Sequence, residues 1–323
     1  MGICTIPSER GFRAPWPIAL AIAICLAAPA ASGAAPRVTV SLKPLHSLVA
    51  GVMEGVGSPE LLLRGAGSPH AYSLKPSEAR LLAGADILFW VGGSLESFLE
   101  KPLGTLGSKA KVVAALQAPG VALLPAREGG AWDEQHAGHG EAGSREAGHG
   151  VEDVPDGHVW LDPSNAKAIA RAAAGALGQV DPANRERYDA NAARLAARID
   201  ALDTELTALL IPVRGVPYVV FHDAYQDLER RYALRAVGSV AVSPDRSPGA
   251  KRVREIREKI QRLEARCVFG EPQFPPALLA SLTEGTEART GELDPLGAGI
   301  PAGPDAWFVL MRAIGASLAS CLR

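Results

Sequence analysis

Short apolar runs alternate with longer amphipathic stretches along the chain from Arg37 onward. Apolar runs of four to eight residues with turn residues on either side predict β-strands, and longer stretches with a helical period predict helices. Strands that alternate with helices are typical of a mostly parallel sheet with helices on both faces. The pattern therefore predicts an α/β fold in which the apolar runs are buried strands.

The alternation occurs twice, which predicts two similar lobes. In the first, strands are expected in "RVTVSL", "PELLLRGAGSPH" and "ILFWVGG", with helices in "LHSLVAGVMEGVG" and from Pro76, a residue that suits a first helical turn. In the second, strands are expected in "VPYVVFHDAY", "ALRAVGSVAV", "ARCVFGEP" and "ARTGELDPLG". The amphipathic segment "AKRVREIREKIQRLEA" lies between two of these strands and predicts a helix.

A long amphipathic segment, "NRERYDANAARLAARIDALDTELTALLIP", separates the two lobes. Its apolar residues recur at spacings of four and three, which predicts one helix with a single apolar stripe: Tyr188, Ala192, Leu195, Ile199, Leu202, Leu206 and Leu209. A coiled-coil dimer is the alternative, but the stripe covers only about three heptads. We therefore expect a monomer with an N-terminal lobe at 36–180, a linking helix at 181–212 and a C-terminal lobe at 213–323.

The first 35 residues form a segment of a different kind. Arg10 and Arg13 precede the apolar run "PIALAIAICLAAPAA", and small residues follow in "ASGAAP". This order is typical of a secretory signal peptide, and the run is shorter than the roughly 20 apolar residues that span a bilayer. We predict a signal peptide at 1–35, cleaved between Ala30 and Ala35, and a mature chain without a membrane span.

Charge and cysteine content narrow the classes of function. The chain has 33 Lys and Arg against 35 Asp and Glu, a net charge of −2, with no basic block, so a nucleic-acid partner is not expected. The mature chain would keep Cys267 and Cys321. In an oxidising compartment these two form either one disulfide or a buried thiol pair.

Residues 127–156 are rich in Gly, Ala, Glu and His and lack apolar periodicity, which predicts a disordered loop. The loop contains His136, His139 and His149. With nothing to fix their rings, these histidines would bind a metal ion weakly and transiently. The alternative is a solvated spacer without a role in metal binding.

Three other histidines lie next to predicted strands. His70 ends the loop after "ELLL", His158 precedes "VWLDP", which is expected to be a strand followed by a capped helix, and His222 follows "PYVVF". In α/β folds, ligands bind outside the carboxyl ends of strands, so side chains there converge. Asp294 has the same kind of position. Three imidazoles and a carboxylate suit a tetrahedral zinc site, although a single histidine, such as His46, is more often a packed residue.

The motifs of common enzyme classes are absent from the sequence. It has no HExxH, GxSxG, Walker-type or dinucleotide-binding pattern, so we do not expect an enzyme. One alternative is a secreted zinc-dependent enzyme with Glu271 or Asp223 as its base. Another is an extracellular zinc-storage or adhesion protein.

The ordered motifs "SPHAYSLKPSEARLLAGADILFWVGGSLESFLEKPL", "DGHVWLDPSNA", "VPYVVFHDAYQDLERRY" and "CVFGEPQFPPALL…LDPLG…SCL" resemble one family. It is the periplasmic zinc-binding component of ABC uptake transporters, the ZnuA-like branch of the metal-binding solute-binding proteins. The resemblance covers nearly everything from Arg37 to the C-terminus. It implies that the protein captures Zn²⁺ in the periplasm and delivers it to a membrane permease that works with a cytoplasmic ATPase.

The resemblance also implies roles for residues. His70, His158 and His222 would be the zinc ligands, in a cleft between lobes that the linking helix joins rigidly, and Cys267 and Cys321 would form a disulfide. Some relatives have an acidic residue before the first ligand, where this chain has Pro69, so the fourth ligand would be Asp294 or water. Manganese-selective relatives have a carboxylate at the position of His222, and an imidazole-rich site suits zinc better.

Overall fold

The computed structural model describes residues 34–65, 67–107, 109–127, 154–241, 249–272 and 276–323. Within these ranges, Ala34–Arg323 form one compact unit. Residues 1–33 of the predicted signal peptide and residues 128–153 of the predicted histidine-rich loop lie outside the described residues. Among the residues described, no helix combines the length and apolar character needed to cross a membrane.

The first lobe is built on a parallel four-stranded sheet in the order β2-β1-β3-β4. Its strands are β1 (Val38–Val40), β2 (Glu60–Leu61), β3 (Ile87–Trp90) and β4 (Lys111–Ala114). Its helices are α1 (Lys43–Val52), α2 (Pro76–Gly84) and α3 (Ser97–Thr105), with 3-10 turns η1 (Pro69–Ala71) and η2 (Ala115–Gln117). The central strands β1 and β3 are buried, as their continuous apolar runs predict.

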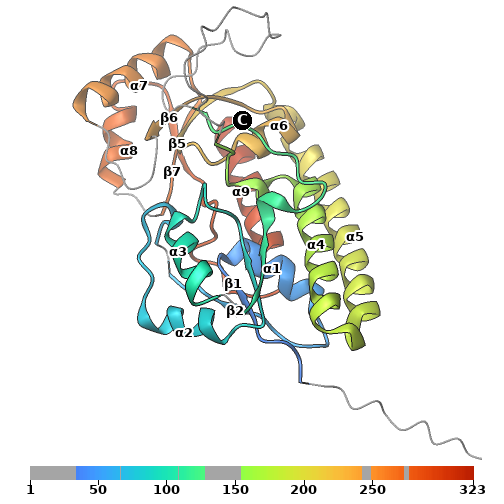
Figure 1. Cartoon of the computed structure of the whole chain (residues 1–323). Helices are drawn as coiled ribbons and strands as arrows, with labels where there is room; N and C mark the ends of the chain where they lie inside the picture. The colour runs from blue at the N-terminus through green and yellow to red at the C-terminus, as the bar shows by residue number, and fades with distance from the viewer. Residues whose placement is uncertain (1–33, 66, 108, 128–153, 242–248, 273–275) are drawn as a thin grey trace, which may run out of the picture. The chain divides into compact units, whose positions relative to one another are not determined.

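The second lobe repeats this topology, with a parallel sheet in the order β6-β5-β7-β8. Its strands are β5 (Pro217–His222), β6 (Arg235–Ala241), β7 (Cys267–Gly270) and β8 (Arg289–Glu292). Its helices are α6 (Gln226–Tyr232), α7 (Ala250–Arg262) and α8 (Pro276–Thr283), of which α7 and α8 lie side by side against the sheet (Figure 1). The prediction of two parallel α/β lobes is confirmed.

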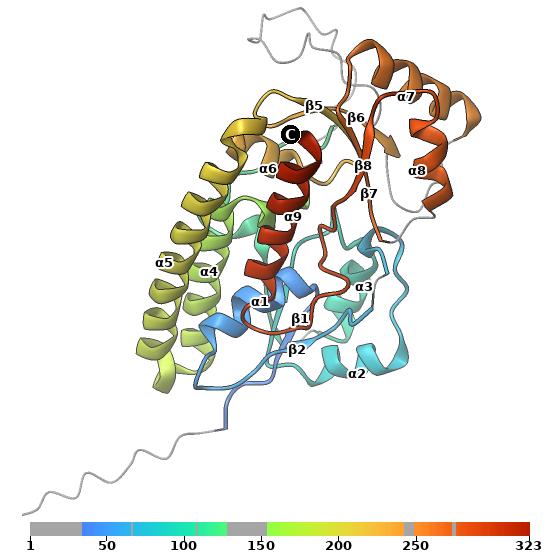
Figure 2. The same cartoon turned by 180° about the vertical axis from the view of Figure 1, so that it is seen from behind.

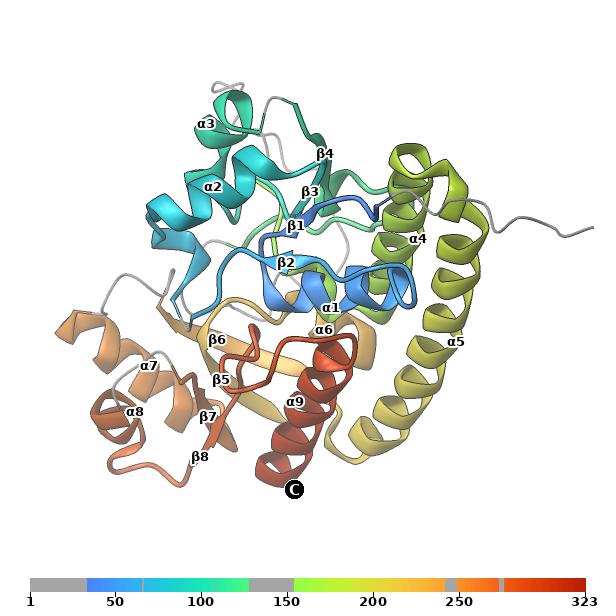
Figure 3. The same cartoon turned by 90° about the horizontal axis from the view of Figure 1, so that it is seen from below.

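Three long helices connect and cover the two sheets. They are α4 (Pro163–Val180), α5 (Arg185–Leu210) and α9 (Ala306–Leu322). The 3-10 turn η4 (Val159–Leu161) precedes α4, η5 (Pro182–Asn184) joins α4 to α5, and η6 (Ile211–Val213) follows α5. Helix α5 packs along α4 and also contacts α1 and α9 (Figures 2 and 3). The predicted stripe is buried from Tyr188 to Leu206, whereas Leu209 is only partly buried and Leu210 is buried instead. The contacts of α5 with α1, α4 and α9 confirm that this helix packs on its own lobes.

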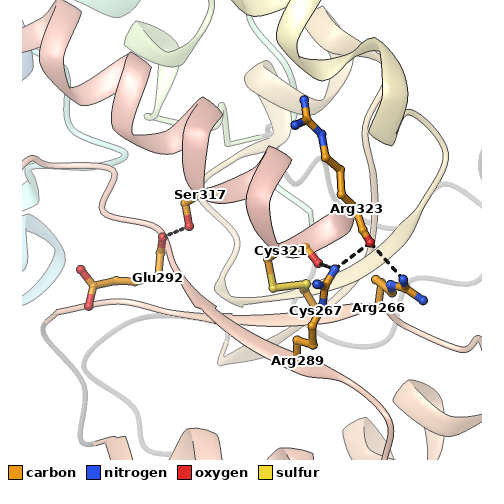
Figure 4. Close-up of a disulfide and its surroundings, with 7 residues drawn as sticks. All are labelled: Arg266, Cys267, Arg289, Glu292, Ser317, Cys321 and Arg323. Atoms are coloured by element: carbon orange, nitrogen blue, oxygen red, sulfur yellow. Dashed lines mark hydrogen bonds between the residues drawn. A yellow bond between two sulfur atoms is a disulfide. The ribbon is translucent and has the colours of Figure 1, made fainter.

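A disulfide links Cys267, the first residue of β7, to Cys321 in the last turn of α9 (Figure 4). The guanidinium of Arg289 on β8 donates to the carbonyl oxygens of Cys321 and Arg323. These contacts fix the C-terminal end of α9 against the second sheet. Of the two states left open for the cysteine pair, the structure shows the disulfide.

Two local expectations differ from the structure. The apolar residues "VWL" after His158 are not a strand but the 3-10 turn η4, buried on all sides, so that prediction is wrong. The pattern also missed β4, whose residues Lys111 and Val112 are exposed. The boundaries 36–180, 181–212 and 213–323 remain predictions, because all three segments belong to the same compact unit.

Candidate metal centre

His222 lies at a position where α/β folds bind ligands. It is the last residue of β5, and the strand order of the second sheet reverses between β5 and β7. At such a point the segments that follow neighbouring strands diverge and leave a crevice at the carboxyl ends. Glu271 directly follows β7, and its Oε1 lies 2.5 Å from Nδ1 of His222. The two side chains therefore come from the two strands that border the crevice.

His158 is held by the residues around it in sequence. Asp156 Oδ1 accepts the backbone N–H of His158 at 3.0 Å and lies 2.7 Å from its Nδ1. The ring of Trp160, in η4, lies edge-on to the imidazole with 5.4 Å between centroids. Asp162 then caps α4 by accepting the backbone N–H of Ser164 at 2.6 Å, which confirms the predicted cap.

His70 comes from the connection between β2 and α2 in the first lobe. It lies in the 3-10 turn η1, and its backbone N–H donates to Ser68 Oγ at 3.2 Å. Pro69 precedes it and is buried. His70 is partly buried as a residue, with its Nε2 atom buried, whereas His158 and His222 are both 4% exposed. Of the three residues, His70 is therefore the least buried.

The three histidines converge on one point. Their ring centroids are 5.6 Å apart for His70 and His158, 5.8 Å for His70 and His222, and 5.3 Å for His158 and His222. One nitrogen from each ring lies within 4.8 Å of the others, and among the described residues these three form the group that could hold a metal ion. The adjoining cavity of about 10 Å³ is lined by the three histidines, Ser68, Pro69, Glu271, Pro295 and Leu296.

The hydrogen bonds of His158 and His222 leave their Nε2 atoms for a ligand. In each ring Nδ1 faces a carboxylate, which can only accept, so Nδ1 carries the proton and Nε2 of the neutral ring carries a lone pair. The two Nε2 atoms are 3.4 Å apart. Two lone pairs directed at each other repel unless a proton or a cation lies between them. The geometry therefore suits an electrophile bound at this point.

The electrostatics of the site come from the carboxylates behind the rings. Burial lowers the pKa of His222, but the carboxylates of Glu271, Asp223 and Asp156 together raise it by more, so this pKa lies above its ordinary value. Burial raises the pKa of Asp156, but His158 and Arg127 lower it by more, so this pKa lies below its ordinary value. A cation in the cavity would thus have negative charge behind two of the three imidazoles.

Asp294, the fourth candidate, has its carboxylate occupied by backbone groups. Oδ1 accepts the N–H groups of Leu296 and Gly297 at 3.0 and 2.9 Å, and Oδ2 accepts that of Ala298 at 2.5 Å. The ammonium of Lys43 on α1 donates to the carbonyl oxygens of Gly297 and Ala298. Asp294 thus orders the loop that lines the cavity, and it lies outside the group formed by the three histidines.

The other candidate residues have different surroundings. His46 is buried in α1, with Nε2 3.0 Å from the carbonyl oxygen of Pro59. Asp223 accepts hydrogen bonds from Arg127, and Glu271 faces His222, so both candidate bases of the alternative zinc enzyme have partners of their own. His136, His139 and His149 lie outside the described residues.

Sequence reasoning missed the hydrogen-bond partners of two candidate ligands, His158 and His222. Asp156 was not singled out, and Glu271 was considered only as a catalytic base. The sequence contained a signal for each residue. Asp156 precedes His158 by two residues, a spacing that favours side-chain contacts to the local backbone. Glu271 lies near the end of the predicted strand segment "ARCVFGEP", in the lobe that carries His222.

The chain matches one protein family over most of its length. The family model described as "Zinc-uptake complex component A periplasmic" (ZnuA) matches residues 38–321. The High-affinity zinc uptake system protein ZnuA of Brucella abortus (strain 2308) is 44% identical over 310 residues, which cover 90% of this chain and 93% of that protein. The protein of the same name from Yersinia pestis is 36% identical over 316 residues, which cover 94% and 96%.

Solved structures show the same fold. A crystal structure of ZnuA superposes with a TM-score of 0.72 at 24% identity, covering 90% of this chain and all of that chain. A ZnuA deletion mutant with zinc bound superposes with a TM-score of 0.70 at 25% identity, covering 89% and 98%. The family match spans nearly the whole described fold, including all three histidines. This chain therefore belongs to the ZnuA family of periplasmic components of zinc-uptake complexes.

Proposed function

We propose that this protein captures Zn²⁺ through His70, His158 and His222, with water in the fourth position, and hands it to an uptake transporter. The observation that carries the proposal is the 3.4 Å separation of the Nε2 atoms of His158 and His222. In a tetrahedral zinc site with Zn–N bonds of about 2.0–2.1 Å, two ligand nitrogens lie about 3.3–3.4 Å apart. The two rings already have the spacing that the ion requires.

The chemistry of the ligands supports zinc as the cargo. Three neutral imidazoles are ligands that zinc accepts readily, whereas manganese and magnesium favour carboxylate and water oxygens. Asp294, which would have supplied such an oxygen, accepts three backbone N–H groups instead. The relatives named above are zinc-uptake proteins, so the donor set and the family point to the same ion.

The family supports a place for the protein in the uptake pathway. We propose that residues 1–35 are removed as a signal peptide, with cleavage between Ala30 and Ala35. The mature chain then works in the periplasm as a monomer, and its partner is an ABC permease that a cytoplasmic ATPase drives. Binding and delivery, rather than catalysis, are its role.

For the histidine-rich segment we propose weak, additional zinc binding by His136, His139 and His149. Residues on both sides of this segment pair with each other, since Ala126 N–H donates to Val154 O at 2.8 Å. Deleting residues 129–152 should therefore leave the fold intact. Isothermal titration of the deletion variant should lose the weak zinc equivalents and keep the tight one. Equal stoichiometry in both proteins would show that the segment binds nothing.

The tight site is tested by replacing its ligands one at a time. His70→Ala, His158→Ala and His222→Ala should each lower zinc affinity by several orders of magnitude, because one of three protein ligands is lost. His46→Ala is the matched control, since His46 is a buried histidine whose ring contacts the backbone of Pro59. Competition with a chromogenic chelator measures the affinities. If His222→Ala bound zinc as tightly as the parent, the assignment would be wrong.

A further inference from the structure

Two short segments next to the site pair with each other and form what we call the stem, residues 124–127 and 154–156. Pro125 and Pro155 form an antiparallel bridge. Ala126 N–H donates to Val154 O, and Asp156 N–H donates to Leu124 O, both at 2.8 Å. Because Asp156 also holds the backbone and Nδ1 of His158, the position of the stem determines the position of that ring.

The side chain of Arg127 attaches the stem to the second lobe. Its Nε lies 3.1 and 2.9 Å from Oδ1 and Oδ2 of Asp223, and Nη2 also donates to Asp223. Its Nη1 donates to Glu229 Oε2 on α6 at 2.8 Å. The side chains of Asp223 and Glu229 are only 8% and 7% exposed. Gln226 adds a neutral contact, from its Nε2 to Pro125 O at 2.9 Å.

These contacts form one continuous chain of hydrogen bonds and covalent neighbours between the candidate ligands His158 and His222. Asp223 follows His222 in the chain, so the guanidinium holds the residue next to one ligand. Through the stem and Asp156, it is also tied to His158. A planar guanidinium that binds a carboxylate with two nitrogens fixes both distance and orientation, which a single ammonium does not. These contacts thus constrain the separation between His158 and His222 from outside the site.

We propose that Arg127 is a positioning residue for zinc binding, which holds the stem against Asp223 and so keeps the Nε2 atoms of His158 and His222 at the spacing that the ion requires. This inference rests on the proposed zinc site. Without the contact between Arg127 and Asp223, the two rings move independently. Zinc then dissociates faster, because each ligand is lost more readily.

A simpler role for Arg127 would be to neutralise two buried carboxylates. Arg231 on α6 offers a matched control, since it too binds a largely buried carboxylate with two nitrogens. Its Nε donates to Asp203 Oδ1 at 3.0 Å, its Nη2 donates to Oδ2, and the Asp203 side chain is 12% exposed. That pair joins α6 to α5 rather than the stem to the residue after His222. Loss of either arginine costs stability, but only the loss of Arg127 should alter the site.

The test compares Arg127→Met, Arg127→Lys and Arg231→Met in the full mature chain. Zinc affinity is measured by chelator competition, the dissociation rate by stopped-flow mixing with excess chelator, and ligand geometry by the visible absorption of the Co²⁺-loaded protein. Arg127→Met should bind zinc about tenfold more weakly, mainly through faster dissociation, as is usual for partners that orient ligands. Its cobalt spectrum should change.

Arg127→Lys keeps the positive charge but loses the planar guanidinium that binds the carboxylate with two nitrogens. It therefore separates the positioning of the stem from the neutralisation of Asp223 and Glu229. It should still release zinc at least roughly threefold faster than the parent, and it carries the test if Arg127→Met does not fold. Arg231→Met should lower the unfolding midpoint with parental zinc kinetics and a parental cobalt spectrum. Parental kinetics and spectrum in Arg127→Lys, or in a folded Arg127→Met, would overturn the inference. Failure of the zinc site itself would appear separately, as parental affinity in His222→Ala.

Discussion

Oε1 of Glu271 lies 2.5 Å from Nδ1 of His222, where His222 ends β5 and Glu271 directly follows the neighbouring parallel strand β7. The carboxylate selects the tautomer of the ring and directs Nε2 into the cavity. It also raises the pKa of His222 against the effect of burial. The same residue therefore strengthens the imidazole as a ligand and makes its proton harder to remove.

Glu271→Gln should weaken zinc binding by about 10–100-fold, because partners that orient ligand histidines have effects of this size. The variant also removes the negative charge that raises the pKa of His222, so its zinc binding should persist to lower pH relative to its own maximum. Chelator competition from pH 5.5 to 8 measures both effects. Glu205→Gln, in an exposed pair with Arg312, is the control. Parental affinity across this range would show that Glu271 does not act on His222.

Asp294→Asn should lower the free energy of unfolding and leave zinc binding within about threefold of the parent. The amide keeps one oxygen for Leu296 and Gly297, but its nitrogen cannot accept the N–H of Ala298. A donor left unsatisfied in this way costs about 1–3 kcal/mol. Urea unfolding and chelator competition give the two quantities, with Asp305→Asn in an exposed pair with Arg198 as the control. An affinity loss as large as that of His222→Ala would identify Asp294 as the fourth ligand.

Glu96→Gln should change how stability depends on pH. Glu96 is fully buried and accepts the backbone N–H of Val91 at 2.6 Å, and burial raises its pKa from 4.5 to about 7. Between these values the folded protein binds more protons than the unfolded chain, so this carboxyl group stabilises the fold fully below about pH 4.5 and loses that effect as pH rises through about 7. Glutamine does not titrate.

The free energy of unfolding of Glu96→Gln minus that of the parent should therefore increase between pH 4.5 and 8, by on the order of 3 kcal/mol. Urea unfolding of the metal-free proteins at several pH values gives this difference directly. Glu100→Gln, on the exposed side of α3, is the control variant. A constant difference between Glu96→Gln and the parent would mean that Glu96 is ionised in the folded protein.

Replacing both Cys267 and Cys321 by serine should lower the free energy of unfolding by up to about 4 kcal/mol, since the disulfide closes a chain separation of 54 residues. Thermal unfolding with and without a reductant checks the result. The parent should become as unstable as the double variant when its disulfide is reduced, and the double variant should not respond. A response in the double variant would mean that the reductant acts elsewhere.

The sequence predicted correctly the strands that are buried along their whole length and the helix that is buried along one side. The central strands β1, β3, β5 and β7 are buried and read as apolar runs, and the stripe of α5 is buried on one side. Strand β4 was missed because it begins with the charged Lys111 and its apolar residues continue without a break into the 3-10 turn η2. The "VWL" turn was taken for a strand because three buried apolar residues look alike in a strand and in a 3-10 turn.

For the site, the three histidines could be picked out because each borders a predicted element. The fate of Asp294 could not be predicted in this way. Its carboxylate binds the backbone of its own loop, and that loop is held by Lys43, more than 250 residues earlier in the chain. The same limit applies to Arg127, whose partners Asp223 and Glu229 lie far along the chain. Such pairings depend on the folded arrangement of the lobes.

The three imidazoles come from three distant segments, and this has a consequence for the lifetime of the protein. In the proposed site a bound ion would join the β2–α2 connection, the residue before η4 and the end of β5, so unfolding of any of them would release it. By mass action, free zinc at a hundred times the dissociation constant stabilises the folded state by about 2.7 kcal/mol, which makes unfolded chains about a hundredfold rarer. Proteases that cleave unfolded chains would then degrade the metal-free protein faster than the zinc-bound protein.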